Sequence, residues 1–329
     1  MFTIGVTGTD GKTSCSHFIA QALDTHDRRC GVIGTLGYGL YGELSTSMHT
    51  TPDALTVQQA LRSMQTAGAR CVVSEVSSHA MDQGRVRGVS FDLAVLTNLT
   101  RDHLDYHGDL ESYAEAKRKL FHSDGLRYAV INADDNFGSA LLDAIPPGVA
   151  PIAYRLENNP FRTRFPAQWV IGRNLQFDVN GLSMDVQTPW GSGSMHSGLL
   201  GRFNASNLLA TLASLCVVGL PFQEALRRLA VTRTVAGRME RFDMGEGRPL
   251  AVIDFAHTAA ALEAVLSSLR AHCRGKLWCV FGAGGDRDRG KRSLMGAVAE
   301  RHADEIVLTD DNPRTEDAQR IIDDICSGL

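Results

Sequence analysis

The sequence predicts an α/β protein with a mostly parallel sheet, a small antiparallel sheet and a second, shorter α/β domain. Three observations support this prediction. Short β-rich runs alternate with helical patterns over the first 135 residues, period-two alternation appears between about residues 150 and 200, and strand–helix alternation returns after about residue 250. A chain of 329 residues also fits about two domains at roughly 150 residues each.

Buried parallel strands are predicted from four apolar runs in the first part. The first run leads into a glycine-rich loop and then an amphipathic stretch through Leu23. Parallel strands need crossover connections, and the helices in those crossovers cover both faces of the sheet. The predicted strands are Thr3–Thr7, Cys71–Val76, Leu93–Thr97 and Tyr128–Asn132.

A hairpin is predicted where the pattern changes to alternating apolar and polar residues. The runs Leu175–Val179 and Leu182–Val186 are separated by Asn180-Gly181, a strong short-range hairpin signal. A helix is predicted from Asn204 to Gly219. The Arg- and Gly-rich segment Val231–Gly247 is interpreted as the hinge, which divides the chain into domains of residues 1–233 and 234–329.

The last part repeats the strand–helix pattern on a smaller scale and is predicted to form three βα units, half of a Rossmann-like fold. That is short for an autonomous substrate domain. The predicted elements are strands at Leu250–Ile253, Leu277–Phe281 and Ile306–Leu308, with helices through Arg270, near Leu294–His302 and near Asp317–Ile325.

Composition and charge exclude several classes of protein. A formal charge of −4 with 43% hydrophobic and 21% charged residues is typical of a soluble globular protein, not of a disordered chain or a nucleic-acid binder relying on bulk charge. Neither a leader nor an apolar run of about 18 residues is evident, so no membrane partner is expected. The 7 cysteines include no C-x-x-C pair, which favours free thiols in a reducing cytoplasm.

The run Gly8-Thr-Asp-Gly-Lys-Thr13 lies between a predicted strand and a predicted helix. Glycines let the main chain approach an anion, and the start of a helix attracts phosphate. Lys12 can reach the β- and γ-phosphates, and the Thr13 hydroxyl can bind Mg²⁺. The loop is shorter than the full P-loop pattern because Val6 stands where a glycine is expected, and an ordinary glycine-rich turn is the alternative. The predicted phosphate-binding residues are Gly8, Thr9, Asp10, Gly11, Lys12, Thr13 and Ser14.

With this loop, nine phrases of the sequence resemble the Mur ligases in order and approximate spacing. The resemblance covers nearly the whole chain, and it is greatest to the type that adds meso-diaminopimelate. The phrases are Gly8–Thr13, Thr50–Asp53, Glu75–His79, Asn98–Asp105, Gly201–Asn207, Gly237–Arg241, Asp254–His257, Gly284–Asp288 and Asp311–Arg314.

The resemblance implies a P-loop central ATPase domain, a C-terminal amino-acid-binding domain, and ATP and Mg²⁺ as cofactors. A ligase of this family joins a carboxylate to an amine. ATP phosphorylates the carboxylate to an acyl phosphate, and the amine then expels phosphate. Transfer of the γ-phosphoryl group requires positioning and charge neutralisation by Mg²⁺, a lysine and an arginine, with no protein nucleophile.

The resemblance assigns Mg²⁺ ligation to Thr13, Glu75, His103 and Lys117. Glu75 and His103 also follow predicted strand ends, where open α/β sheets bind ligands. In this family the lysine at the position of Lys117 is carbamylated, which turns a cation into an anionic oxygen ligand for a second Mg²⁺. Without the resemblance, a packed or solvated role for His103 and a solvated helix-face role for Lys117 stay open. Lys12, Lys117, Arg238 and His103 are the predicted catalytic residues.

The resemblance also extends the nucleotide site beyond the loop. It places Asn204 and Asn207 near the adenine or ribose, and Asp254 with His257 at the nucleotide pocket. Arg238 follows Gly237 in the predicted hinge, from which a guanidinium could swing onto the phosphoryl group when domains close. An interdomain salt bridge is the alternative role for Arg238.

Two further groups of residues match substrate positions of the family. A UDP-linked muramoyl-peptide is expected at Thr50, Thr51, Ser78 and Arg85, and the incoming amino acid at Arg287, Asp311, Asn312 and Arg314. Arg85 is suited to a carboxylate through its bidentate fork. Arg314 supplies a cation for the distal carboxylate of diaminopimelate, whereas a role as an ordinary exposed loop residue is the alternative.

The family's N-terminal UDP-binding domain and a Gly-Lys-Gly-His-Glu phrase near its C-terminus have no counterpart in the sequence. Two interpretations are open: a shortened piece of a tripeptide synthetase, or a stand-alone relative that joins an amino acid to a non-UDP carboxylate. A non-catalytic nucleotide-binding remnant, working with a partner that supplies the missing domain, is a third. In every case small-molecule ligands are expected, and nucleic acid and membrane are not expected as partners.

Overall fold

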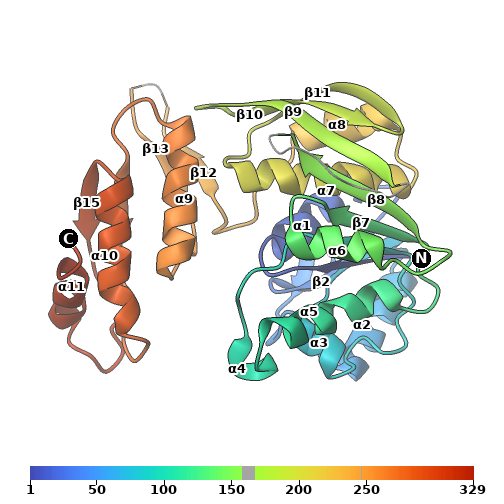
Figure 1. Ribbon diagram of the computed structural model, residues 1–329, viewed down its shortest axis with the longest axis horizontal. Coiled ribbons are helices and arrows are strands. Elements are labelled where there is room, and N and C mark those ends of the chain that lie inside the picture. The colour runs from blue at the N-terminus through green and yellow to red at the C-terminus, as the bar shows by residue number, and fades with distance from the viewer. Residues whose placement is uncertain (158–166, 246) are drawn as a thin grey trace. The chain divides into compact units, whose positions relative to one another are not determined.

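The computed structural model describes residues 1–157, 167–245 and 247–329 and divides into two compact units (Figure 1). The first unit comprises Met1–Leu175, Ser183–Gly198 and Phe203–Val235. The second unit comprises Gln176–Leu182, Leu199–Arg202 and Ala236–Leu329. Each unit is described by itself below.

One large sheet organises the first unit, in the order β11-β10-β9-β8-β7-β6-β1-β5-β2-β3-β4. Pairing is parallel from β2 through β5, β1, β6, β7 and β8 to β9, while β2–β3 and β3–β4 are antiparallel. The strands are β1 (Phe2–Thr7), β2 (Cys30–Gly34), β3 (Gly37–Leu40), β4 (Glu43–Ser45), β5 (Cys71–Glu75), β6 (Leu93–Leu96), β7 (Tyr128–Asn132), β8 (Ala150–Leu156), β9 (Gln168–Asp178), β10 (Gly181–Thr188) and β11 (Gly191–Ser197).

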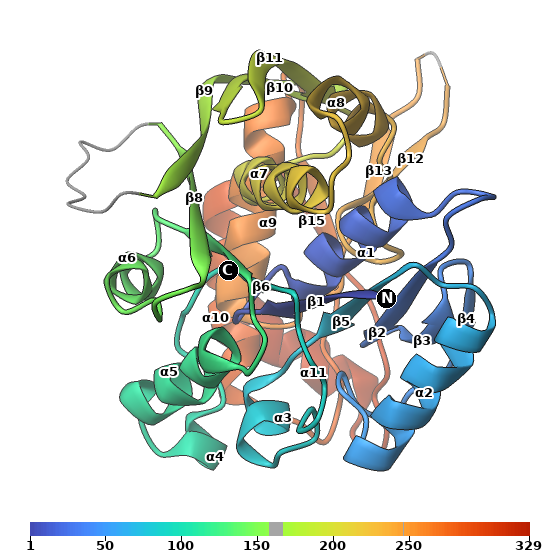
Figure 2. The same ribbon diagram turned by 90° about the vertical axis from the view of Figure 1, so that its right-hand side faces the viewer.

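Helices cover both faces of this sheet. Figure 2 shows α1 and α7 on one side and α2, α3 and α5 on the other. The central strands β5 and β6 are therefore buried along their whole length, which explains their continuous apolar runs. The helices are α1 (Lys12–Leu23), α2 (Ala54–Thr66), α3 (Ser78–Asp82), α4 (Leu104–His107), α5 (Leu110–Arg118), α6 (Asn136–Asp143), α7 (Arg202–Val217) and α8 (Phe222–Ala230), with the 3-10 helix η1 (Lys119–His122).

The predicted α/β class is confirmed, including the four buried strands β1, β5, β6 and β7. The predicted hairpin is present as β9 and β10, which are sheet neighbours joined by Val179 and Asn180. The Asp178 carboxylate accepts the Asn180 N–H at 2.7 Å and fixes this turn. The hairpin strands extend the main sheet, because β9 also pairs in parallel with β8.

The second unit holds two small sheets and its own core. β12 (Glu240–Asp243) pairs antiparallel with β13 (Leu250–Ile253), and β14 (Trp278–Phe281) pairs in parallel with β15 (Glu305–Leu308). α9 (Ala259–His272), α10 (Gly290–His302) and α11 (Ala318–Cys326) complete the unit. The core is formed by Leu262, Leu266, Leu277, Cys279, Met295, Val298 and Ala299.

The three predicted βα units are present in the second unit, but their strands are divided between two sheets. β13 pairs with β12, and β12 lies within the segment Val231–Gly247 that was interpreted as a hinge. Glu246 of that segment lies outside the described residues. The boundary between the units, at Val235 and Ala236, also lies in this segment.

Two further features agree with the composition. All seven cysteines are free thiols, and five of them are buried. Within the described residues, no helix has both the length and the apolar character needed to cross a bilayer.

Candidate functional site

The loop between β1 and α1 has a backbone that requires glycine. Gly8 has φ of 151° and Gly11 has φ of 80°, conformations that L side chains rarely adopt. A Cβ on Gly8 would lie 1.8 Å from the Thr97 hydroxyl oxygen, and one on Gly11 would lie 2.8 Å from the Asn207 amide oxygen. Thr97 and Asn207 therefore pack closely against the main chain of this loop.

Thr97 and Asn98, at the end of β6, hold this loop in place. The Thr97 hydroxyl donates to the Asp10 carbonyl at 2.6 Å, and the Asn98 amide oxygen accepts the Asp10 N–H at 2.9 Å. The Asn98 carbonyl accepts the Thr9 N–H at 3.0 Å. Sequence reasoning did not assign a role to either residue, although both follow a buried parallel strand, which was the available signal.

The N-terminus of α1 has no side-chain cap, since Gly11 precedes the helix. Many other helices carry one: Asp53 caps α2, Ser77 caps α3 and Asp109 caps α5. The uncapped start of α1 leaves its N-terminal dipole available to an anion. The predicted residues Gly8 to Ser14 thus form a cradle suited to phosphate.

Lys12 and Lys117 converge on one backbone carbonyl. The Lys12 Nζ donates to the Gly8 carbonyl at 2.9 Å and to the Thr9 carbonyl at 2.7 Å. The Lys117 Nζ, from α5, donates to the same Gly8 carbonyl at 2.8 Å and lies 4.3 Å from the centre of the Tyr113 ring. Burial, together with the nearby Lys12 charge, lowers the pKa of Lys117 to about 6. The Lys12 ammonium therefore marks a place where an anion is favoured.

Glu75, at the end of β5, is fully buried beside the loop. Its carboxylate accepts the Thr13 hydroxyl at 2.8 Å, the Thr35 N–H at 2.9 Å and the Thr35 hydroxyl at 3.1 Å. Burial raises the pKa of Glu75, and these hydrogen bonds oppose the rise. Thr13 and Glu75 together present hard oxygen donors of the kind that Mg²⁺ prefers. Sequence reasoning missed Thr35.

His103 lies in a group of aromatic side chains that reaches the phosphate loop through Tyr113, whose ring is 6.1 Å from that of His103 and whose hydroxyl is 3.1 Å from the Thr9 hydroxyl. It begins α4 with a left-handed φ of 53°, and its Nε2 is 3.3 Å from Asp102 Oδ2. Its ring is 4.8 Å from that of His79, and the ring of His107 is 5.4 Å from His79. Among the described residues, no three His, Cys, Asp or Glu side chains are arranged to hold a metal ion by themselves. Ligation of Mg²⁺ by His103 therefore stays a prediction.

The residues predicted to contact the peptide substrate lie around the end of β5. The Thr51 hydroxyl donates to the Glu75 carbonyl at 2.7 Å, and the Arg85 guanidinium donates to the Thr51 carbonyl at 2.9 Å. The remaining two are held by hydrogen bonds: Thr50 with the Thr35 hydroxyl at 3.1 Å, and Ser78 with His107 Nε2 at 2.9 Å. The structure thus brings all four into the neighbourhood of Glu75.

Asn204 and Asn207 are buried in the first turns of α7. The Asn207 amide donates to the Asn204 amide oxygen at 3.2 Å. Because a Cβ on Gly11 would contact Asn207, this pair lies directly against the phosphate loop. The structure therefore places the residues predicted to bind adenosine next to those predicted to bind phosphate.

In the second unit, Asp254 organises the turn that carries Arg238. Its carboxylate accepts the Met239 N–H and the Ala256 N–H, each at 2.8 Å. The Arg238 guanidinium lies 5.9 Å from the centre of the Phe255 ring. His257 follows in the same loop, with Nδ1 2.9 Å from the Phe255 carbonyl. The predicted nucleotide residues of this unit are thus close together.

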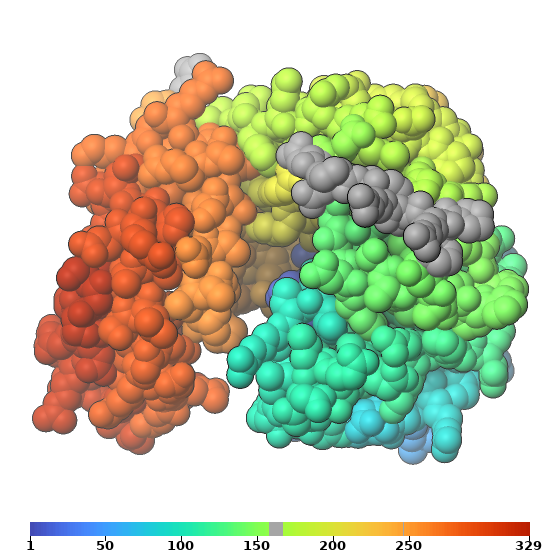
Figure 3. Space-filling model, in the orientation of Figure 1, coloured from blue at the N-terminus to red at the C-terminus, as the bar shows by residue number. Residues whose placement is uncertain are grey.

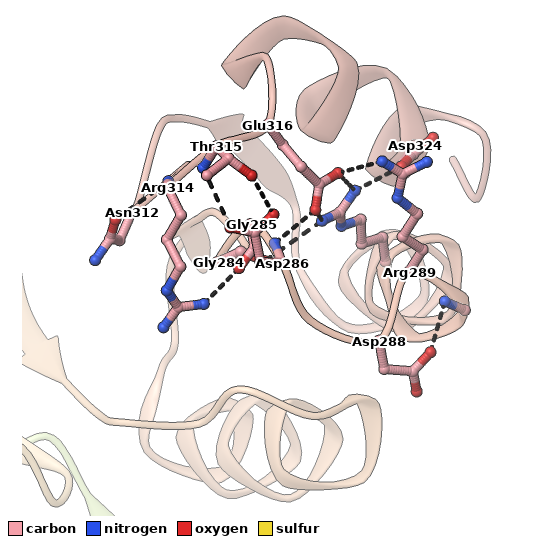
Figure 4. Close-up of polar contacts among 12 residues, drawn as sticks. Gly284, Gly285, Asp286, Asp288, Arg289, Asn312, Arg314, Thr315, Glu316 and Asp324 are labelled. Carbon is pink, nitrogen blue, oxygen red and sulfur yellow. Dashed lines mark hydrogen bonds and ion pairs between the residues drawn. The ribbon is translucent and has the colours of Figure 1, made fainter.

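The residues predicted to bind the amino acid occupy two facing loops of the second unit (Figure 4). The Gly285 N–H donates to the Asn312 carbonyl at 2.8 Å, and the Arg314 guanidinium donates to the Gly285 carbonyl. Arg287 and Asp311 are exposed in these loops. The two loops follow the ends of β14 and β15. They therefore carry all four predicted residues, Arg287, Asp311, Asn312 and Arg314, in one region of the unit.

Comparison with known proteins identifies the family. The pattern of the Mur ligase middle domain matches residues 6–215, and that of the Mur ligase glutamate ligase domain matches residues 237–328. The chain belongs to the Mur ligase family. The resemblance carried by the nine phrases is thereby confirmed.

Individual Mur ligases are similar over the whole chain. UDP-N-acetylmuramoyl-L-alanyl-D-glutamate--2,6-diaminopimelate ligases of Coxiella burnetii and Pseudomonas aeruginosa are 52% and 51% identical to it. A solved structure of a ligase with that name superimposes with a TM-score of 0.80 at 40% identity and covers 100% of the chain. The chain spans 66%, 65% and 66% of the lengths of these three proteins.

Proposed function

We propose that this chain is the catalytic part of an ATP- and Mg²⁺-dependent amide ligase that adds 2,6-diaminopimelate to UDP-N-acetylmuramoyl-L-alanyl-D-glutamate. One observation carries the proposal: the uncapped start of α1, Lys12 and Lys117 converge beside a hydroxyl–carboxylate pair. The names and identities of the similar proteins support the choice of substrates.

The chain's own groups fit the triphosphate of ATP. The backbone of Gly8 to Ser14 and Lys12 would hold the phosphates, while Thr13 and Glu75 would hold Mg²⁺. Bound Mg²⁺-ATP would supply the phosphoryl group that converts the peptide carboxylate into an acyl phosphate, from which the amine displaces phosphate. Arg238 would neutralise charge on the transferred group.

The lowered pKa of Lys117 supports a second role for this residue, as a carbamylated metal ligand. A lysine with pKa of about 6 is largely neutral near pH 7, so its Nζ lone pair can attack CO₂. The new N–C bond gives a carbamic acid, which loses a proton and leaves an anionic oxygen ligand. Carbamylated Lys117 would then contribute an oxygen ligand to a second Mg²⁺.

The two substrates would be recognised by opposite charges. Arg85, held near Thr51 by its hydrogen bond, would receive a carboxylate of the muramoyl-peptide together with Thr50 and Ser78. In the second unit, Arg314 would receive the distal carboxylate of diaminopimelate. Among the described residues, no carboxylate forms an ion pair with Arg314, so the guanidinium is available to a substrate anion.

Oxygen transfer tests the reaction directly. The peptide substrate is labelled with heavy oxygen at the reacting carboxylate, and phosphate released in the presence of ATP, Mg²⁺ and diaminopimelate is analysed by mass spectrometry. We expect one labelled oxygen in the phosphate and ADP formation that requires both substrates. Unlabelled phosphate, or ADP formation with the amine alone, would contradict the proposal.

A matched pair of variants links this result to the site. Lys12→Ala should abolish ADP formation because Lys12 faces the phosphate position, whereas Lys119→Ala should leave it intact because Lys119 pairs with Asp82 at 3.3 Å and is half exposed. Equal activity of both variants would show that the loop is not the site of phosphoryl transfer.

A further inference from the structure

Two loops of the second unit are connected by direct contacts. Residues 282–289 follow β14 and residues 309–317 follow β15, and these strands are parallel neighbours, so both loops leave the same sheet edge. The Thr315 N–H and hydroxyl donate to the Asp286 carboxylate at 3.2 and 2.7 Å. The contacts fix the relative positions of Arg287 and Arg314, one in each loop.

Both loops adopt a backbone conformation that needs external support. Asp286 has φ of 52° and Arg314 has φ of 50°, values in the left-handed region that non-glycine residues rarely adopt. Such residues persist when the surrounding structure over-determines them, and they concentrate at ligand-binding sites. Arg314 is itself a predicted substrate contact, and Asp286 directly precedes another, Arg287.

Besides these contacts, the carboxylate of Glu316 supports both loops (Figure 4). Its Oε1 accepts the Asp286 N–H at 2.6 Å and Arg292 Nη2 at 2.8 Å, and its Oε2 accepts Arg292 Nη1 at 3.0 Å. The Arg292 side chain is 0% exposed and also donates to Asp324 on α11 at 2.8 Å. Glu316 therefore joins the first loop, the second loop and α10 at one point.

The geometry points to Glu316 and Arg292 as positioning residues for the amino-acid substrate: they hold the two loops so that the Arg314 guanidinium is set to receive a carboxylate. This inference rests on the proposed function. A bidentate arginine fork fixes the plane and direction of the Glu316 carboxylate, which a single lysine contact would not do. Because Arg292 comes from α10, the loops take their position from a helix packed in the core.

Hydrogen exchange tests the support without any ligand. In Glu316→Gln, the amides of residues 284–288 and 311–316 should exchange faster than in the wild-type chain. Asp324→Asn is the matched control, because it removes the negative charge from an Arg292 contact of the same length but leaves the Asp286 contact intact. Unchanged exchange in a folded Glu316→Gln variant would overturn the inference.

Ligand affinity separates positioning from general stability. By calorimetry, Glu316→Gln should bind meso-diaminopimelate roughly 10-fold more weakly or worse, since small misplacements of contact groups cost that much or more. The ATP affinity of Glu316→Gln should equal that of the wild type. The diaminopimelate affinity of Asp324→Asn should also equal that of the wild type. The inference would be overturned, with the proposed function left standing, if both variants lost diaminopimelate affinity equally. The same holds if Glu316→Gln lost no diaminopimelate affinity. Failure of the wild-type chain to bind diaminopimelate would overturn the proposed function and this inference together.

Two milder variants keep the test decisive if Glu316→Gln does not fold. Thr315→Val removes the hydroxyl donor to Asp286 but keeps the backbone donor, and should weaken diaminopimelate binding by a smaller factor. Arg292→Lys keeps the charge but loses the fork, and should also raise the KM for diaminopimelate with kcat little changed. Wild-type values for both variants would contradict the positioning role.

Discussion

At the scale of single residues, Lys117 makes the stability of the fold depend on pH. Its pKa is lowered from 10.5 to about 6 in the native state, so between these values the unfolded chain binds a proton that the native chain lacks. Stability should therefore rise with pH through this window. The pH dependence of the free energy of unfolding, measured with urea, should be less steep in Lys117→Met than in wild type.

Lys119→Met provides the control for this prediction. Lys119 lies two residues after Lys117 in the sequence, and its side chain is half exposed. This variant should keep the wild-type slope. Parallel curves for wild type and Lys117→Met between pH 6 and 10.5 would mean that the buried amine does not titrate as the structure implies.

Glu316 changes the stability in the same direction with pH, but in an acidic range. Its hydrogen bonds with Arg292 and then with the Asp286 N–H lower its pKa from 4.5 to about 2. The stabilisation is complete above pH 4.5 and is lost as the pH falls towards 2. Glu316→Gln should therefore be destabilised most at neutral pH, and its deficit should shrink with acidification. A deficit independent of pH would exclude the ionised pair as its cause.

At the scale of elements, Asp53 is expected to stabilise α2 as its N-cap. The carboxylate accepts the Leu55 and Thr56 N–H groups at 3.0 and 3.1 Å and the Thr56 hydroxyl at 2.6 Å. Asp53→Ala should lower the free energy of unfolding by about 1 kcal/mol in urea titrations, and Asp53→Asn by only a few tenths. Equal losses in the two variants would contradict the capping role.

The central apolar strands were predictable because their burial leaves a direct pattern in the sequence. β1, β5, β6 and β7 are buried on both faces and read as continuous apolar runs, and the Asn180-Gly181 turn marks β9 and β10. Strands β2 and β3 were missed because glycines interrupt their apolar runs.

Those glycines serve the tertiary structure, which local patterns do not report. A Cβ on Gly34 would lie 2.1 Å from Glu75 Oε1, and one on Gly31 would lie 2.3 Å from the Met64 sulfur. Likewise, Asp243 and Leu250 pair across β12 and β13, although the charged and glycine-rich segment between the units gave no strand pattern.

The site was predictable to a different extent at different residues. The phosphate loop has local spacing that a sequence shows, and the structure places Lys12, Thr13 and Glu75 together as the strand ends suggested. Thr35 and Asn98 could not be found in this way, because they act through contacts across the sheet. A functional role for Lys117 was expected only from the family, since helix spacing alone favours a solvated lysine. Its contact with the Gly8 carbonyl was not predicted.

At the scale of the whole molecule, the two units have separate cores, and the predicted phosphate loop and the predicted amino-acid loops lie in different units. Leu209, fully buried on α7, belongs to the first unit, and Met295, 2% exposed on α10, belongs to the core of the second. The phosphate loop lies in the first unit, and the loops around Arg314 lie in the second. Each ligand should therefore stabilise one unit more than the other.

Calorimetry of the full chain should accordingly resolve two transitions. Leu209→Ala and Met295→Ala each remove buried side-chain volume at a cost of about 2–5 kcal/mol, and each should lower only the transition of its own unit. Ligands that bind only the native state raise its stability by mass action. ATP with Mg²⁺ should therefore raise the transition that is sensitive to Leu209→Ala, and diaminopimelate the one sensitive to Met295→Ala. A single transition moved equally by both substitutions and by both ligands would show that the units unfold as one cooperative body.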